Sequence, residues 1–90
     1  MKKVYPEEKG KLMIQGHQME WVLRRSKGES AFGIRGSRIF MLSVSRDGKQ
    51  TLNYDHGYSL KPGPEDEETT LCLSFLIDKY GKEKRKERKS

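Results

Sequence analysis

The sequence contains one cysteine, two histidines and no long apolar run among its 90 residues. The single cysteine, Cys72, excludes an internal disulfide and cannot supply the paired CxxC motifs of a structural zinc site. No segment approaches the roughly 20 apolar residues of a membrane-spanning helix, and the first residues lack the apolar core of a secretory signal. These absences predict a cytoplasmic protein without a membrane-spanning helix, a metal or a cofactor.

Apolar side chains are also scarce, at 32% of the residues against 36% that are charged. A chain of this length buries only about 60% of the surface that its unfolded form exposes, which leaves little room for an enclosed active site. The apolar residues nevertheless recur at strand and helix spacings, which argues against disorder. We therefore expect one domain at residues 11–81, between a flexible N-terminal arm at 1–10 and a basic C-terminal tail at 82–90.

The net charge of +6 is concentrated at the C-terminal end. Residues 79–90 contain seven basic and two acidic side chains, whereas the preceding 78 residues contain twelve and eleven. The folded part is therefore predicted to be nearly neutral. A basic run of this kind is typical of a solubilising extension or of an arm that holds phosphates. The candidate nucleic-acid residues of the tail are Lys82, Lys84, Arg85, Lys86, Arg88 and Lys89.

Several segments have the composition of short strands joined by turns. In residues 18–25, Met19, Trp21 and Leu23 alternate with other side chains at the period of a half-buried strand. A two-residue turn at Gly16-His17 would join this strand to the one before it, as a type II′ turn with glycine first. The predicted strands cover residues 11–15, 18–25, 31–35, 38–46 and 49–55.

The turn at Asp47-Gly48 allows two registers. A two-residue turn pairs Arg46 with Lys49, whereas a three-residue turn with Gly48 as a bulge pairs Ser45 with Lys49. The second register buries more apolar surface, because a one-residue slip moves every side chain to the other face of the sheet. It places Phe40, Leu42 and Val44 on the same face as Tyr54, Leu52 and Gln50, respectively. We therefore predict the bulged turn.

The turn at Gly36-Ser37 leaves two alternatives. It would pair Ile34 with Ile39, on the face of the middle strand opposite to Leu42. Either this strand is apolar on both faces, or it bulges between Ile39 and Leu42.

A helix is predicted after the Lys61–Pro64 segment, which ends the sheet. Residues 65–68 are all acidic and suit the positive end of the helix dipole, and Gly81 suits its C-cap. The fold class is therefore α+β: an antiparallel sheet of four to five strands with one C-terminal helix packed on one face. In the predicted core, Trp21, Leu23, Leu42, Val44 and Leu52 meet Leu71, Cys72, Phe75, Leu76 and Tyr80. Phe75→Ala is then expected to cost about 3–5 kcal/mol.

No residue pattern indicates catalysis. Cys72 lies on the apolar stripe of the predicted helix, where a free thiol packs as a small hydrophobe rather than as a nucleophile. His17 and His56 lie in separate turns without metal-ligand spacing, and turn chemistry explains both. We therefore expect a protein that is not an enzyme and has no small-molecule substrate.

The segment from Asp55 to Tyr58 is the strongest candidate for an interaction site. It brings an aspartate, His56 and an aromatic residue together, although an Asx-type turn closing the last strand would explain the same residues. Arg35 and Arg38 are further interaction candidates, as part of a basic sheet face that would include Arg24, Arg25, Arg46 and Lys49. The near-neutral charge of the folded part weakens such a face as a nucleic-acid site.

These residues resemble a small uncharacterised domain family of bacteria, phages and mobile elements. The matching residues are Phe32-Gly33-Ile34, Gly36, Arg38-Ile39, Leu42, Val44, Gly48, Asn53-Tyr54-Asp55, Gly57 and Lys79-Tyr80. The chain departs from the family pattern at Ser37, where glycine is expected, at His56, where arginine is expected, and at Tyr58, where tryptophan is expected. The resemblance implies no known activity.

Two functions follow as expectations. The first is a non-enzymatic accessory or interaction module of a phage or mobile element, which binds a protein through its sheet face or the turn at 55–58. The alternative is a DNA-binding domain that uses a three-stranded sheet face and the basic tail. That alternative is similar to the small amino-terminal domains of tyrosine integrases in architecture only.

Overall fold

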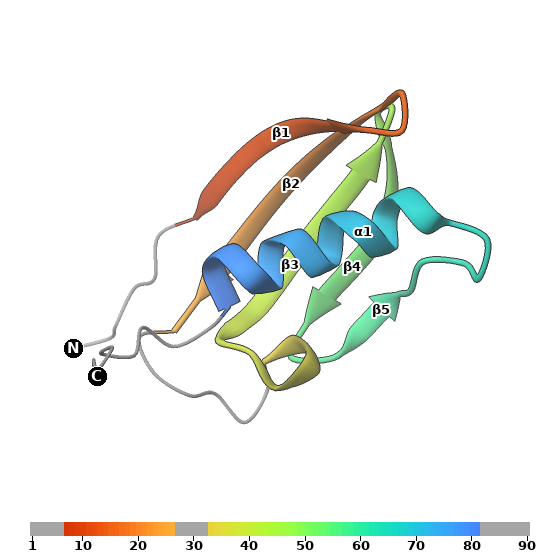
Figure 1. Cartoon of the computed structure of the whole chain (residues 1–90). Helices are drawn as coiled ribbons and strands as arrows, with labels where there is room; N and C mark the ends of the chain where they lie inside the picture. Colours follow the sequence, from red (N-terminus) through yellow and green to blue (C-terminus); the bar gives the residue numbers. More distant parts are fainter. Residues whose placement is uncertain (1–6, 27–32, 82–90) are drawn as a thin grey trace, which may run out of the picture.

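The computed structural model describes residues 7–26 and 33–81, and it shows one sheet with one helix across it (Figure 1). The sheet has the order β1-β2-β3-β4-β5, and each strand pairs antiparallel with its sequence neighbour. This arrangement confirms the predicted α+β class. The strands are β1 (Glu8–Ile14), β2 (His17–Arg25), β3 (Ile39–Arg46), β4 (Lys49–Asp55) and β5 (Tyr58–Leu60).

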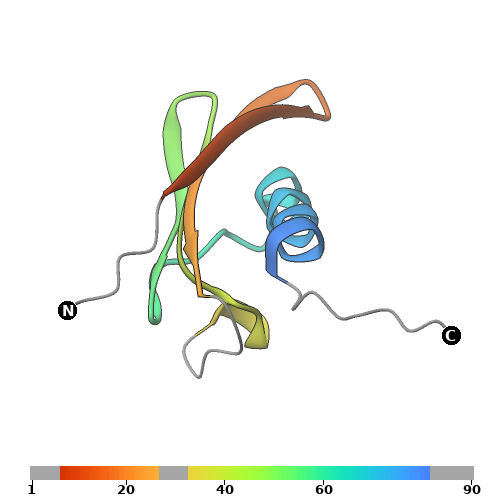
Figure 2. The same ribbon diagram turned by 90° about the vertical axis from the view of Figure 1, so that its left-hand side faces the viewer.

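The helix α1 (Glu67–Leu76) lies on one face of the sheet and ends in a wider helical turn at Ile77–Gly81. Figure 2 shows that the hairpin end of β1 and β2 curves toward the side on which α1 lies. The buried helix residues follow the spacing of one helix face: Thr69, Cys72, Leu73 and Leu76. They face a sheet core of Met19, Trp21, Leu23, Ile39, Leu42, Val44, Leu52 and Tyr54.

The predicted assignment of Leu71 and Phe75 to the core is wrong. Leu71 is 42% exposed and Phe75 is 41% exposed, whereas Leu73, which was not among the predicted contacts, is buried. The helix turns a face centred on Cys72 and Leu76 toward the sheet. Since a helix this short can bury only one stripe, the other apolar positions remain outside.

The first hairpin turns one residue earlier than predicted. Gln15 and Gly16 both have positive φ, 50° and 83°, and Ile14 pairs with His17. Positive φ at both central residues is the signature of a type I′ turn, which matches the twist of the flanking strands. In addition, β1 begins at Glu8, so residues 8–10 belong to the sheet rather than to an arm. Residues 1–6 lie outside the described part.

The turn between β3 and β4 also differs from the prediction. Arg46 pairs directly with Lys49 around Asp47 and Gly48, both at positive φ, so the predicted three-residue turn is wrong. The predicted faces are nevertheless correct, because Leu42 lies opposite Tyr54 and Val44 opposite Leu52. The extra residue is Thr51, inside β4.

The bulge at Thr51 has a packing role. Its hydroxyl lies 2.7 Å from the hydroxyl of Thr69 on the buried face of α1, so the bulge connects the sheet to the helix.

The strand predicted at residues 31–35 is not present in the described part. Ile34–Gly36 forms a single 3₁₀ turn in which Arg35 has φ 54°, and residues 31 and 32 lie outside the described residues. The Gly36-Ser37 hairpin is therefore wrong, and β3 pairs with β2 instead. A register shift where Arg25 meets Ile39 resolves the two alternatives left open. The strand bulges, and both Ile39 and Leu42 are fully buried.

The tips of the two long hairpins are tied together by Asp47. Its carboxylate accepts hydrogen bonds from His17 Nδ1, at 2.6 Å, and from the backbone N–H of Gln18, at 2.9 Å. The backbone N–H of Asp47 donates to the carbonyl of Gln18 at 2.8 Å. The His17 contact, followed by the Gln18 N–H, holds the pKa of Asp47 below its usual value of 3.8.

This lowered pKa predicts a pH-dependent stability difference between the protein and Asp47→Asn. Because the native carboxyl has the lower pKa, its contribution is complete above pH 3.8 and is lost as pH falls through the native pKa. Asparagine tolerates the left-handed backbone and retains one acceptor oxygen, so the variant should fold. Urea unfolding between pH 2 and 6 should show a gap that closes on acidification. A gap independent of pH would contradict this role.

Candidate functional site

The β4–β5 end of the sheet carries the residues of the strongest sequence candidate. His56 has φ 63°, and its backbone N–H donates to the carbonyl of Phe40 at 2.9 Å, so the turn is fastened to β3. The N–H of Asp55 donates to the carbonyl of Gly57 at 2.8 Å, which closes the turn. The His56 ring stacks on Phe40 with centroids 5.4 Å apart, and its Nδ1 lies 2.8 Å from the Asp55 carboxylate. These contacts fasten the turn to β3 and close it on itself.

Tyr58 is a partly exposed aromatic side chain at this end of the sheet. Its ring meets Tyr54 edge to face, with centroids 5.0 Å apart, and is 39% exposed. The Lys61 ammonium lies 5.5 Å from the centroid of the Tyr58 ring, within the range of a cation–π contact. Partial burial raises the pKa of the Tyr58 hydroxyl, and the charge of Arg35 opposes that shift. The phenol therefore stays protonated at neutral pH.

We name this surface the aromatic end, and it consists of Arg35, Phe40, Tyr54, Asp55, His56, Tyr58 and Lys61. It offers a partly exposed tyrosine ring with a hydroxyl donor and the Lys61 ammonium beside it, a half-exposed imidazole, and Arg35, whose charge acts on Tyr58. Exposed aromatic side chains with nearby cations are the residue types that are enriched where proteins bind one another. The arrangement therefore suits binding through side-chain contacts.

Four of the five interaction candidates gather here, and one does not. Asp55, His56 and Tyr58 lie on one turn and its edge strand, and Arg35 is close enough for its charge to act on Tyr58. Arg38 instead forms hydrogen bonds with the carbonyl groups at the end of the helix. Its backbone N–H donates to the carbonyl of Gly81 at 2.9 Å, and its guanidinium donates to the carbonyl of Tyr80 at 3.4 Å.

The role of Arg38 has a simple cause, since the last carbonyls of a helix lack intrahelical donors and carry its negative end. Arg25 donates to the same Tyr80 carbonyl, at 3.3 Å. The tail candidates Lys82, Lys84, Arg85, Lys86, Arg88 and Lys89 lie outside the described residues.

A basic sheet face is not observed in the described part of the chain. Arg24 contacts Glu7 at 3.2 Å, Arg25 contacts Glu8 at 2.6 Å, and Arg46 pairs with the carboxylate of Asp66. The described residues hold ten basic and ten acidic side chains, whereas the remaining residues hold nine and three. The whole net charge of +6 therefore belongs to segments outside the described residues.

Cys72 is fully buried in the helix–sheet core, and burial raises the pKa of its thiol to about 11. At neutral pH the thiolate, which is the reactive form, is therefore scarce as well as inaccessible.

We predict that Cys72 reacts with a disulfide reagent such as DTNB only when the chain opens. Without denaturant the labelling rate should follow the small population of open molecules, and it should rise to that of a free thiol in guanidinium. Rapid stoichiometric labelling of the native protein at pH 7 would contradict the buried position.

Two negative findings apply to the described residues only. No group of three His, Cys, Asp or Glu side chains among them is placed to hold a metal ion. Within residues 7–26 and 33–81, no helix has the length and apolar character needed to cross a membrane.

The sequence did not predict that three apolar side chains of β5 and α1 are exposed. Leu71 and Phe75 lie one turn apart on the outer side of α1, and Leu60 is 40% exposed at the end of β5. The width of the apolar stripe in residues 71–77 was the available signal, because a stripe wider than one face must leave some members outside. No signal marked β5, a strand of three residues.

Comparison with known families shows a match. The family model described as Domain of unknown function (DUF7678) matches residues 7–81 of the chain. No curated protein and no solved structure matches.

Proposed function

The chain belongs to the family described as Domain of unknown function (DUF7678), and on that premise we propose that it is a non-enzymatic interaction module. The module acts for a phage or mobile element in the bacterial cytoplasm. It binds a protein partner through the aromatic end. The observation that carries the proposal is Tyr58, an exposed aromatic side chain on a rigid turn with Lys61 beside its ring.

The turn is rigid for reasons that favour binding. Backbone bonds to β3 and within the turn, together with the Phe40–His56 stack, hold the side chains in place before a partner arrives. A preorganised surface loses less conformational entropy on binding, so more of the contact energy appears as affinity. Tyrosine adds large contact area with few rotatable bonds, and its hydroxyl can donate to a partner carbonyl.

The charge balance favours protein over nucleic acid as the partner of the folded part. Nucleic-acid affinity depends on neutralising phosphates, and the described residues carry equal numbers of basic and acidic side chains. Three of the arginines that could have formed a basic sheet face are held by carboxylates. Protein interfaces do not need such an excess of one charge.

The proposal is tested by comparing two alanine variants in affinity capture. Tyr58→Ala removes the exposed ring of the aromatic end. Phe75→Ala removes a ring of almost the same exposed fraction from α1, 41% against 39% for Tyr58. A partner captured by the unmodified protein should be lost with Tyr58→Ala and retained with Phe75→Ala. Equal capture by all three proteins, or loss with Phe75→Ala alone, would reject the aromatic end.

DNA binding remains the second candidate because of one local feature. Lys61 lies 5.5 Å from the centroid of the Tyr58 ring and the charge of Arg35 acts on its hydroxyl, and an exposed aromatic ring near cations can stack on an unpaired base. This candidate predicts binding to single-stranded DNA that weakens steeply with salt and is lost in Tyr58→Ala. Binding that instead disappears on truncation after Gly81 would assign the affinity to the tail.

A further inference from the structure

The outer edge of β1 is long and regular. β1 has seven residues, pairs with β2 along its whole length without a register shift, and has no strand on its other side in the described part of the chain. β5, at the opposite edge, has only three residues. Long, regular edges offer a row of backbone donors and acceptors to another extended chain, and proteins usually shorten, bulge or charge them. Along β1, charged side chains are the only one of these protections.

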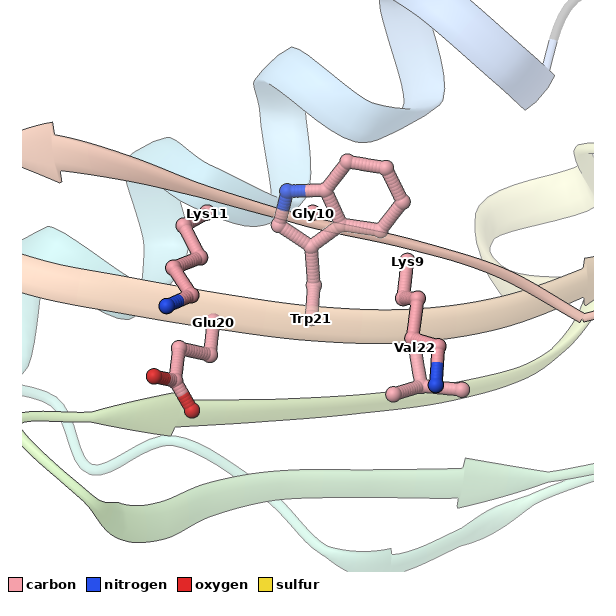
Figure 3. A pocket seen from close by; sticks show the side chains of 6 residues that line it. All are labelled: Lys9, Gly10, Lys11, Glu20, Trp21 and Val22. Atoms are coloured by element: carbon pink, nitrogen blue, oxygen red, sulfur yellow. The ribbon is translucent and has the colours of Figure 1, made fainter.

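The middle of β1 carries a pocket of about 200 Å³ at Gly10 and Trp21. These residues are register partners, and a Cβ at position 10 would come within 2.6 Å of Trp21 Cζ2, so glycine is required beneath the ring. Figure 3 shows the indole reaching across to Gly10, while the Lys9 and Lys11 side chains extend back toward β2. Glu20 and Val22 complete the lining.

The buried Nε1–H of Trp21 has no acceptor among the described residues. Its nitrogen lies on the Lys11 side of Gly10 in Figure 3.

Two cations flank the pocket. Lys9 and Lys11 are exposed, lie two residues apart on the same face of β1, and make no ion pair within the described part of the chain. Glu7 and Glu8, the neighbouring acids, are engaged by Arg24 and Arg25. Glu20 is the register partner of Lys11 and lines the same pocket, so the edge carries two positive charges and one negative charge around a residue without a side chain.

We propose that β1 receives an acidic, extended segment of a partner protein as a sixth strand. Acidic residues two apart in that segment lie opposite Lys9 and Lys11, and the apolar residue between them lies opposite Gly10, beside the Trp21 ring. Backbone hydrogen bonds to the free edge supply affinity, and the alternating side chains supply specificity. This surface is separate from the aromatic end, so a negative binding test at one site does not bear on the other.

A second copy of the chain is a poorer occupant. In every antiparallel self-pairing centred on Lys9, Gly10 or Lys11, lysine lies opposite lysine, and like charges directly opposed destabilise a strand pair. The excess charge of the chain, +6, adds a long-range repulsion between copies.

The test uses the full chain and the heptapeptide Thr-Val-Glu-Val-Glu-Val-Thr, blocked at both ends. Trp21 is the only tryptophan, so its fluorescence reports on the pocket directly. The peptide should produce a saturable fluorescence change, and amide NMR shifts should map to Glu8–Ile14. A peptide with lysine in place of both glutamates should bind about tenfold more weakly or worse, because two cross-strand pairs change sign.

Two controls separate strand addition from simple charge attraction. An acidic peptide with N-methyl groups on the residues that face β1 should not bind, because it cannot complete the backbone ladder. The double variant Lys9→Glu, Lys11→Glu changes exposed side chains only and should reverse the preference between the two peptides. Failure of the acidic peptide to bind, equal binding of both peptides, shifts confined to residues away from β1 and Trp21, or self-association through β1 would each overturn the proposal.

Discussion

Replacement of Leu76 by alanine is expected to lower the free energy of unfolding by about 2–5 kcal/mol. Leu76 has no exposed surface and lies on the helix face that packs against the sheet. Its removal leaves a cavity between the two layers, in a domain whose total stability is itself only about 5–15 kcal/mol. Urea or guanidinium unfolding followed by circular dichroism measures the difference.

Phe75→Ala is the matched control for the docking of α1. Phe75 is 41% exposed, and its ring is contacted by the Lys79 ammonium, 5.7 Å from its centroid. Its removal should cost only about 1 kcal/mol, less than the sequence alone suggests, because little cavity is formed. If Phe75→Ala costs as much as Leu76→Ala, the helix docks through a different face.

Replacement of Asp66 by alanine is expected to cost about 2–3 kcal/mol. Asp66 is the N-cap of α1, and its carboxylate accepts from the Thr69 N–H at 3.0 Å and the Thr69 hydroxyl at 2.8 Å. The same carboxylate pairs with Arg46 at the end of β3. One side chain therefore starts the helix, positions the threonine that meets the Thr51 bulge, and fixes the helix to the sheet.

Asp66→Asn separates the cap from the ion pair. Asparagine is a good N-cap but carries no charge, so its cost should fall between zero and that of Asp66→Ala. Glu65→Ala, a change at an exposed acidic residue just before the cap, should be nearly neutral. Equal unfolding free energies for Glu65→Ala and Asp66→Ala would show that the cap and the ion pair contribute nothing specific.

The sequence predicted the sheet but not the positions of its bulges. Alternation in β3 and β4 was enough to place Leu42 and Val44 on the face of Leu52 and Tyr54. Whether the extra residue lay in the turn or at Thr51 could not be decided, because both solutions bury the same apolar side chains. The choice depends on distant contacts, from the turn to Gln18 and from the bulge to the helix.

The orientation of the helix was undetermined for a related reason. Six of the seven residues from 71 to 77 are apolar, so the pattern predicts a helix without saying which stripe faces the sheet. Only the shape of the opposing surface selects Cys72, Leu73 and Leu76.

The parts of the candidate site that depend on residues adjacent in the sequence could be predicted. The turn at 55–58 and its positive φ follow from residue types in one short segment. The edge strand β5 and the use of Arg38 at the helix end depend on chain segments brought together only by folding, and no local pattern marks them. The Gly10–Trp21 pair has the same origin, since its register follows from where the first hairpin turns.

Photo-crosslinking from position 58 in the cell tests most directly whether the aromatic end binds a protein. Benzoylphenylalanine replaces Tyr58 in one full-length protein and Phe75 in a second, which controls for an aromatic ring of similar exposure. The account predicts a discrete adduct from position 58 that resists nuclease and is degraded by protease, and none of that size from position 75. Nuclease-sensitive adducts from position 58, or the same adducts from both positions, would contradict it.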